Sequence, residues 1–249
     1  MAEDKIEGSV DDRRFGGVAR LYGPELRERF LKASVVVAGL GGVGSWAAEA
    51  LARTGIGQLV LVDFDHIAES NTNRQLHALE GAYGKAKVEA MAERIRLINP
   101  EINLIVHDEF LEPENLDRII PETAFVLDAT DSVQTKIALA VWANKSERAL
   151  VMCGAAGGKS DPTSVRCDDL SRTEQDALLA KVRQGLRQDH GFSRNLKKKI
   201  GIRAIYSHEP RAGVASGGLA CSGYGSTVMV TAACGLAAAA EILNLIAAQ

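Results

Sequence analysis

Short apolar runs alternate with segments of helical periodicity through most of this chain. Five apolar runs predict strands, at residues 34–38, 59–62, 103–106, 124–127 and 150–152. Apolar residues spaced three and four apart predict helices at residues 44–53, 85–98, 132–145 and 173–187. This alternation predicts an α/β fold with a Rossmann-like, mostly parallel sheet and flanking helices.

The pattern is weaker at the two ends of the chain. The first 30 residues carry five arginines and predict a helical lead-in. Beyond the last predicted strand we expect a short strand ending at Cys167, a polar helix and a basic loop. No repeat or linker is present, so we expect one domain over residues 1–249. Its first half, 1–154, is expected to bind a nucleotide, and 155–249 to form a C-terminal extension for substrate binding and dimerisation.

The stretch from Ala212 to Ala240 contains no charged residue. Its length raises the question of a membrane span, because about 20 apolar residues cross a bilayer. Alanine, glycine, serine and threonine dominate the stretch, however, and Glu241 interrupts its most apolar part. Because small residues let helices approach closely, we expect a buried or dimer-interface helix and no stable membrane span.

Composition places the chain among globular proteins. Its 249 residues are 46% hydrophobic, enough to bury a full core, and its formal net charge is -3. We see no CxxC pair and no signal peptide, so a cytoplasmic location fits and a structural zinc site does not. The four cysteines lie far apart, at Cys153, Cys167, Cys221 and Cys234.

Charge is distributed unevenly along the chain. The segment from Lys181 to Arg211 holds nine Lys or Arg residues against two acids, so it carries +7 while the remainder carries -10. Such a segment can neutralise nucleic-acid phosphates, and its Phe192 and Tyr206 are candidates for stacking on bases. A solvated polar surface is the alternative interpretation.

A glycine-rich turn separates the first predicted strand from the helix that follows it. Gly39, Gly41 and Gly44 fit the pattern GxGxxG, in which small residues permit a tight turn and let phosphate approach helix N–H groups. Asp63 ends the next strand, where an acid can bind ribose hydroxyls. Several nucleotide folds share these features, an NAD or FAD enzyme among them, and glycines that merely turn the chain are the simplest alternative.

The residues after Asp63 favour ATP over a dinucleotide. Asn71, Asn73 and Arg74 follow the strand's carboxyl end, and Lys87 lies in the first turn of the next helix. Two cations at one strand end suit attack on the α-phosphate of ATP, because negative charge builds on the departing pyrophosphate. A dinucleotide, in contrast, is not cleaved at its pyrophosphate. For either cation considered alone, a solvated surface role is the default.

A second acidic site follows the strand predicted at 124–127. Asp128 and Asp131 come at the end of that strand, and Ser132 begins a helix. Asp131 could bind the Mg²⁺ that accompanies a triphosphate, since Mg²⁺ prefers one or two carboxylates together with phosphate oxygens. Asp131 or Ser132 could instead cap the helix.

Together these motifs resemble the ubiquitin-activating and ThiF-type adenylating enzymes. The resemblance covers residues 14–154 and rests on GLGGVGS, the DFD acid pair, SNTNRQ, GKAKVEAMAERI, the NP pair and DATDS. It implies that ATP is held by Gly42, Asp63, Asn71, Arg74, Lys87 and Asp131, with Asp131 as a magnesium ligand. We add the neighbouring Gly39, Gly41, Gly44, Asn73 and Ser132 to the expected nucleotide-binding set, and we expect Arg74, Lys87 and Asp131 to be catalytic.

Further segments resemble the tRNA-modifying branch of that family across nearly the whole chain. They are RRFGGVARLYG, NTNRQLHAL, GAAGGKSDPT and a CSGYG segment before STVMVTA. That branch activates the carboxylate of threonylcarbamoyladenosine in the tRNA anticodon loop. The resemblance therefore implies ATP-dependent dehydration of this nucleoside through an acyl-adenylate, by a homodimer that has sulfur-relay proteins among its candidate partners.

Three other functions compete with this interpretation. The first is adenylation of the C-terminal glycine of a small sulfur-carrier protein, but enzymes of that kind commonly carry paired CxxC zinc ligands, and both pairs are missing here. The second is an NAD(P) oxidoreductase, which would bind nicotinamide. The third is a nucleotide-sensing module without turnover.

The resemblance leaves alternatives open at three places. Relatives present an N-terminal arginine of an RxxR pattern to the partner subunit's ATP, and here Arg14 or Arg20 could serve. Cys221 could accept an acyl group as a thioester, although ring closure by a tethered nucleophile does not require one. The region before Cys221 is shorter than in the tRNA-modifying branch, which leaves the flap over the site undefined.

Overall fold

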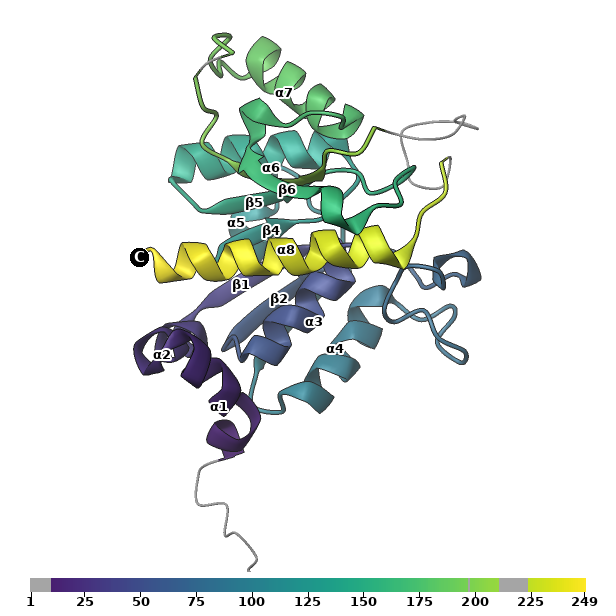
Figure 1. The fold of residues 1–249 in the computed structure, drawn as a ribbon, viewed down its shortest axis with the longest axis vertical. Coiled ribbons are helices and arrows are strands. Elements are labelled where there is room, and N and C mark those ends of the chain that lie inside the picture. Colours follow the sequence, from purple (N-terminus) through teal and green to yellow (C-terminus); the bar gives the residue numbers. More distant parts are fainter. Residues whose placement is uncertain (1–9, 197, 211–223) are drawn as a thin grey trace, which may run out of the picture.

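One mixed sheet runs through the computed structural model, which describes residues 10–196, 198–210 and 224–249 (Figure 1). Within those ranges its strands are β1 (Ser34–Ala38), β2 (Gln58–Val62), β3 (Asn103–His107), β4 (Phe125–Asp128), β5 (Leu150–Cys153), β6 (Val165–Asp169) and β7 (Arg203–Ser207). They lie in the order β3-β2-β1-β4-β5-β7-β6, and only β6 and β7 pair antiparallel among these described strands. The predicted mostly parallel sheet is confirmed.

The strand order reverses between β1 and β4. From β1 the chain builds outward through β2 to β3, and it then crosses to the other side of β1 for β4 and β5. The connections that leave β1 and β4 therefore diverge, which opens a crevice at the carboxyl ends of these strands. The parallel pairing brings the glycine turn after β1 and the polar loops after β2 and β4 to this one edge.

Helices cover both faces of the sheet (Figure 1). They are α1 (Val10–Tyr22), α2 (Pro24–Lys32), α3 (Gly44–Thr54), α4 (Lys87–Ile98), α5 (Leu116–Ile119), α6 (Val133–Ser146), α7 (Ala177–Asp189) and α8 (Val228–Ala247). Because side chains alternate along a strand, Val35 and Val37 pack toward α2, α3, α4 and α8, whereas Val36 and Ala38 pack toward α5, α6 and α7. Burial on both faces explains why β1 is a continuous apolar run.

α8 crosses the sheet beside α3 as a core helix (Figure 1). By length and apolar composition it could span a membrane, but half of its apolar window is buried inside the fold. Cys234, Ala238 and Ile242 recur at intervals of four residues on its buried side. Gly235 allows the close contact with α3, because a Cβ atom there would lie 2.4 Å from the carbonyl oxygen of Val43. The expected buried helix of small residues is confirmed.

Two helices begin two or more residues later than the periodicity predicts. α4 begins at Lys87 rather than at residue 85, because the N–H of Lys87 donates to the carbonyl of Asp65 and holds the preceding residues in an extended turn. α7 begins at Ala177 rather than at residue 173, because the Asp176 carboxylate accepts the N–H of Leu179 and caps the helix there.

β7 was not predicted from the sequence. It lies within the basic segment, where charged residues mask its apolar core of Ala204 and Ile205. Its pairing with β5 places both residues inside the sheet. The basic segment is therefore not one loop, since α7 and β7 occupy its two ends.

Candidate nucleotide-binding site

A cavity of about 340 Å³ lies at the carboxyl edge of the sheet, where β1 and β4 diverge. This volume falls within the usual range for small-molecule sites, about 300–1,000 Å³. The loops after β1 to β5 line it, together with the starts of α4, α7 and α8. The expected nucleotide-binding residues on its wall are Gly39, Gly41, Gly42, Asp63, Asn71, Arg74, Lys87, Asp131 and Ser132. Gly44 and Asn73 do not line the cavity.

The glycine turn is shaped by close backbone contacts. Gly39 has φ +83°, a region that glycine adopts without strain, and a Cβ atom on it would lie 2.9 Å from the carbonyl oxygen of Ala129. A Cβ atom on Gly44 would lie 1.8 Å from the carbonyl oxygen of Gly39. Only glycine fits at these positions, so the turn stays tight and the start of α3 faces the cavity.

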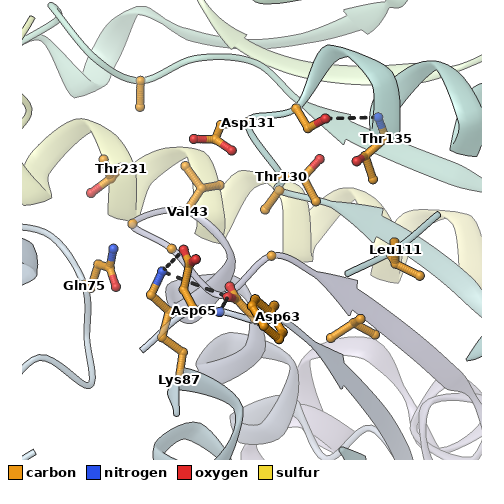
Figure 2. A pocket seen from close by; sticks show the side chains of 18 of the residues that line it. Val43, Asp63, Asp65, Gln75, Lys87, Leu111, Thr130, Asp131, Thr135 and Thr231 are labelled. Carbon is orange, nitrogen blue, oxygen red and sulfur yellow. Dashed lines mark hydrogen bonds and ion pairs between the residues drawn. The ribbon is translucent and has the colours of Figure 1, made fainter. Parts of the chain in front are cut away.

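Asp63 and Lys87 approach the cavity from β2 and from α4. The Asp63 carboxylate accepts the N–H of Leu40 at 2.5 Å and the N–H of Asp65 at 2.8 Å. The Lys87 Nζ lies 2.7 Å from the Asp65 carboxylate and 4.0 Å from that of Asp63. Figure 2 shows the three side chains pointing toward one another. Burial raises the pKa of Asp63, while Lys87 and the two N–H groups act in the opposite direction. These hydrogen bonds hold the Asp63 carboxylate in a fixed orientation on the cavity wall, where it can bind a polar ligand.

Asn71 and Arg74 belong to the loop between β2 and α4. The Asn71 side chain is buried and accepts the N–H of Ala68, so it braces the loop. The Arg74 guanidinium donates to the carbonyl of Ser70 and to the amide oxygen of Asn73. The stem of Arg74 packs on Gly42, where a Cβ atom would lie 3.1 Å from the arginine Cγ. Gly42 therefore lets Arg74 lie directly against the glycine turn.

Asp131 and Ser132 follow β4 and line the cavity. Asp131 lies across the cavity from Asp63 and Lys87 (Figure 2). Ser132 caps α6, since its hydroxyl accepts the N–H of Thr135 at 3.2 Å. The helix-capping alternative thus holds for Ser132, and Asp131 is left exposed on the cavity wall. The described residues contain no group of three or more His, Cys, Asp or Glu side chains able to hold a metal. A cation at Asp131 would need further oxygen ligands from a bound molecule.

A buried ion pair supports the loop that carries Asp131. The Lys136 Nζ lies 3.1 Å from the Asp128 carboxylate, and both side chains are fully buried. The other oxygen of Asp128 accepts the N–H and the hydroxyl of Thr130. Asp128 therefore shapes the loop from inside and does not face the cavity.

Sequence reasoning missed several parts of the cavity wall. Gln75 adjoins Arg74 in the NTNRQ motif, so the motif itself could have indicated it. Phe64 and Phe110 also line the wall, with ring centroids 4.5 Å apart. Phe110 follows β3, and Thr231 lies in the first turn of α8. No local pattern marks these two, because only the fold brings them to the site.

The N-terminal arginines lie away from this cavity. Arg14 donates to the carbonyl of Ile98 at the end of α4, whereas Lys87 begins that helix. The 12 residues of α4 span roughly 18 Å, so Arg14 does not reach the cavity of its own chain. The guanidinium of Arg20 folds back over Gly16 on its own helix. Cys221 lies outside the described residues.

Of the two candidates for base stacking, Tyr206 is wrong, because its ring is buried. Tyr206 is 7% exposed and belongs to the core between the sheet and α6 and α7, and Phe192 packs against the same core. Their rings are used in packing because β7 and the end of α7 fold onto the sheet. A further basic residue of the segment, Arg203, is paired with Glu241 on α8.

Comparisons with known proteins agree on one family. The model of the ThiF family matches residues 16–249. The chain is 44% identical to the tRNA threonylcarbamoyladenosine dehydratase of Escherichia coli, over 95% of this chain and 94% of that protein. Crystal structures of the same Escherichia coli enzyme with AMP and with ATP superpose with TM-scores of 0.90 and 0.89, at 44% and 43% identity. They cover 97% of this chain and 97% and 96% of theirs.

Proposed function

Because this chain belongs to the ThiF family, we propose that it uses ATP to dehydrate threonylcarbamoyladenosine in the anticodon loop of tRNA. One observation carries the proposal: Asp63, Arg74, Lys87 and Asp131 come from two loops and one helix start and line a single cavity. The Escherichia coli relative bears the name of this reaction and binds both ATP and AMP. A tRNA substrate also implies a cytoplasmic location.

The first step forms an acyl-adenylate. The threonyl carboxylate attacks the α-phosphate of ATP, and pyrophosphate leaves. Negative charge builds on the pyrophosphate, and the cationic side chains of Arg74 and Lys87 offset it. The hydrogen-bonded carboxylate of Asp63 orients the ribose hydroxyls. Lys87 exchanges its bond to Asp65 for phosphate oxygens in this step.

The second step closes a ring. A nitrogen within the same substituent attacks the activated carbonyl and closes a five-membered ring. The attacking nitrogen loses its proton, and AMP leaves. The nucleoside has then lost one water, while ATP has been converted to AMP and pyrophosphate. Nucleophile and electrophile are already joined, so orientation supplies most of the advantage and no protein nucleophile is required.

Asp131 fits the role of magnesium ligand. Its carboxylate is exposed on the cavity wall, and no described residue donates a hydrogen bond to it. Mg²⁺ commonly binds proteins through one or two carboxylates and takes its remaining ligands from phosphates and water. When bound, the ion would neutralise phosphate charge beside Arg74 and Lys87.

Exposed basic residues on α7 and after it support tRNA as the substrate. Lys181, Arg194, Lys198 and Lys199 are exposed, and Leu178 at the start of α7 lines the cavity. The 13 residues of α7 span roughly 20 Å. An RNA stem-loop whose modified base enters the cavity can therefore reach these cations with its backbone phosphates.

We also propose that the chain forms a homodimer. Met229 and Leu236 are 60% and 51% exposed, and they lie seven residues apart on one face of α8. A partner subunit would also give Arg14 or Arg20 a second cavity to reach. Sulfur-relay proteins stay among the candidate partners by family resemblance alone.

Mass spectrometry of nucleosides tests the reaction directly. Threonylcarbamoyladenosine-containing tRNA is incubated with the protein, ATP and Mg²⁺, beside an Arg74→Ala variant. We expect an ATP-dependent loss of one water from that nucleoside, absent in the variant. An unchanged nucleoside would overturn the substrate assignment. Pyrophosphate exchange that depends on a carrier protein would then establish the alternative function, adenylation of a sulfur-carrier protein.

A further inference from the structure

Asn73 connects Arg74 to the segment that precedes α8. Its amide oxygen accepts a hydrogen bond from the Nη1 of Arg74 at 2.9 Å, and its Nδ2 donates to the carbonyl of Ser226 at 2.8 Å. The side chain does not line the cavity. This geometry therefore favours a structural role for Asn73 over direct contact with a nucleotide.

The backbone and stem of Arg74 are fixed by other groups. The indole N–H of Trp46 donates to the carbonyl of Arg74 at 3.0 Å, and the arginine stem packs on Gly42. The guanidinium has two bonds, to the carbonyl of Ser70 and to Asn73. Within the described residues, Asn73 is thus the side chain that sets the direction of the charged group.

The anchor of Asn73 is firmly held. Ser226 precedes Thr227, the N-cap residue of α8. The neighbouring Gly225 accepts a hydrogen bond from the N–H of Gly158 at 2.9 Å, and Thr231 in the first turn of α8 is 1% exposed. Because α8 is packed into the core, the position of Ser226 follows from the fold and not from the loop that carries Arg74.

We propose that Asn73 is a positioning residue that directs the guanidinium of Arg74 toward the phosphates of ATP. The inference rests on the proposed role of Arg74 in ATP binding. Both bonds use one nitrogen, Nη1, so the N–H groups on Nε and Nη2 stay available on the other edge of the planar group. That edge can donate two parallel hydrogen bonds to a phosphate.

A neutral amide suits this position better than a carboxylate does. An aspartate at residue 73 would pair with Arg74, and its charge would compete with the phosphate for the same cation. It would also place its negative charge against the carbonyl of Ser226, where the amide now donates. The amide holds the arginine on one side and keeps its full charge for the ligand.

Equilibrium binding of ATP and of adenosine by Asn73 variants tests the inference. We expect Asn73→Ala to weaken ATP binding about tenfold, comparable to the loss of one hydrogen bond to a charged group, and to change adenosine binding less than about twofold. Asn73→Gln keeps the amide oxygen and the amide nitrogen, and it should restore most of the ATP affinity. Asn73→Asp should bind ATP more weakly than Asn73→Ala. Equal losses for ATP and adenosine would overturn the role.

A double-mutant cycle with Arg74 separates positioning from independent binding. In an Arg74→Ala background, Asn73→Ala should cause no further loss of ATP affinity, whereas additive losses would overturn the inference. If Arg74→Ala weakens ATP binding and Asn73→Ala does not, the inference fails while the proposed site stands. If Arg74→Ala itself has no effect, both fail.

Thr72→Val is the matched control. Thr72 is exposed in the same loop, and its hydroxyl bonds to Glu69 and Tyr83 without touching Arg74. We expect this variant to bind ATP as the wild type does. The unfolding midpoint of each variant shows whether weaker binding comes with a loss of fold, and weaker binding shared by Thr72→Val would assign the effect to the loop as a whole.

Discussion

Lys87 is a cationic side chain that is paired with a carboxylate while no ligand is bound. Its side chain is 7% exposed and bonds to Asp65, whose side chain is 64% exposed. An ion pair with one solvated partner contributes little net free energy, so a phosphate can displace Asp65 at small cost. Asp65 therefore pairs with the nearly buried ammonium of Lys87, and a phosphate can replace it.

His77 is a buried histidine that stays neutral. It is 4% exposed, and neither ring nitrogen has a hydrogen-bond partner among the described residues. Burial, and secondarily the charge of Lys87, lower its pKa from 6.5 to about 4. Between these two values an unfolded chain binds a proton that the folded chain excludes, so His77 reduces stability as the pH falls through this window.

We expect His77→Leu to flatten the acid side of the stability profile. The wild type should lose up to about 3 kcal/mol relative to this variant as the pH falls from 6.5 toward 4. Above pH 7 the histidine is neutral in both states, so the pH dependence there should be the same. Denaturant unfolding at a series of pH values measures the difference.

His190→Leu serves as the control, because His190 is exposed at the end of α7. This variant should keep the pH dependence of the wild type. Parallel profiles for the wild type and His77→Leu between pH 4 and 6.5 would show that His77 is not responsible for the acid sensitivity.

At the scale of elements, the contact between α3 and α8 supports the nucleotide site. Gly235 of α8 lies against Val43 and Trp46, which begin α3 directly after the glycine turn. The two helices approach closely enough that no side chain fits between them at this point. Packing of α8 thus fixes the turn that forms one wall of the cavity.

Gly235→Ala should disturb both stability and nucleotide binding. The added Cβ atom would meet the Val43 carbonyl at 2.4 Å and the Trp46 Cβ at 2.9 Å, so α3 and α8 must move apart. We expect a loss of about 1–3 kcal/mol in the free energy of unfolding and weaker ATP binding. Denaturant unfolding and equilibrium binding measure the two effects.

Ala240→Val enlarges an exposed position on the same helix and is the comparison variant. It should leave both quantities close to those of the wild type. If Gly235→Ala lowers stability and leaves ATP binding unchanged, the packing of α8 supports the core but not the glycine turn.

At the scale of the molecule, α7 links the cavity to a cationic surface. This basic surface consists of Lys181, Arg194, Lys198 and Lys199. Part of the +7 segment does not contribute to it, because Arg203 is paired with Glu241 on the other face of the sheet. The basic surface offers charge to RNA, since Tyr206 is buried and Phe192 is partly buried against the core.

The salt dependence of tRNA binding tests this surface. Replacing Lys198 and Lys199 together with alanine should weaken binding at low salt. It should also lower the slope of log affinity against log salt by about 1 for each RNA phosphate that the protein no longer neutralises. ATP binding should not change. Lys32→Ala, which removes an exposed lysine of α2, should have no effect on tRNA binding. An unchanged slope in the double variant would place the RNA elsewhere.

The sequence by itself determined the α/β sheet, the bounds of most strands and part of the cavity wall. Apolar runs in β1 and polar residues directly after β1, β2 and β4 are local features, and parallel pairing necessarily brings such strand ends together. Gly39, Asp63, Arg74, Lys87 and Asp131 were therefore recognisable from the chain alone.

The tertiary structure decided what each polar side chain does there. Ser132 caps α6, and Asn73 bridges Arg74 and Ser226 without lining the cavity. Tyr206 is used in the core. These outcomes depend on contacts between residues distant in sequence, such as residues 73 and 226. Burial and hydrogen bonding arise when distant segments pack together, so a short stretch of sequence cannot predict them.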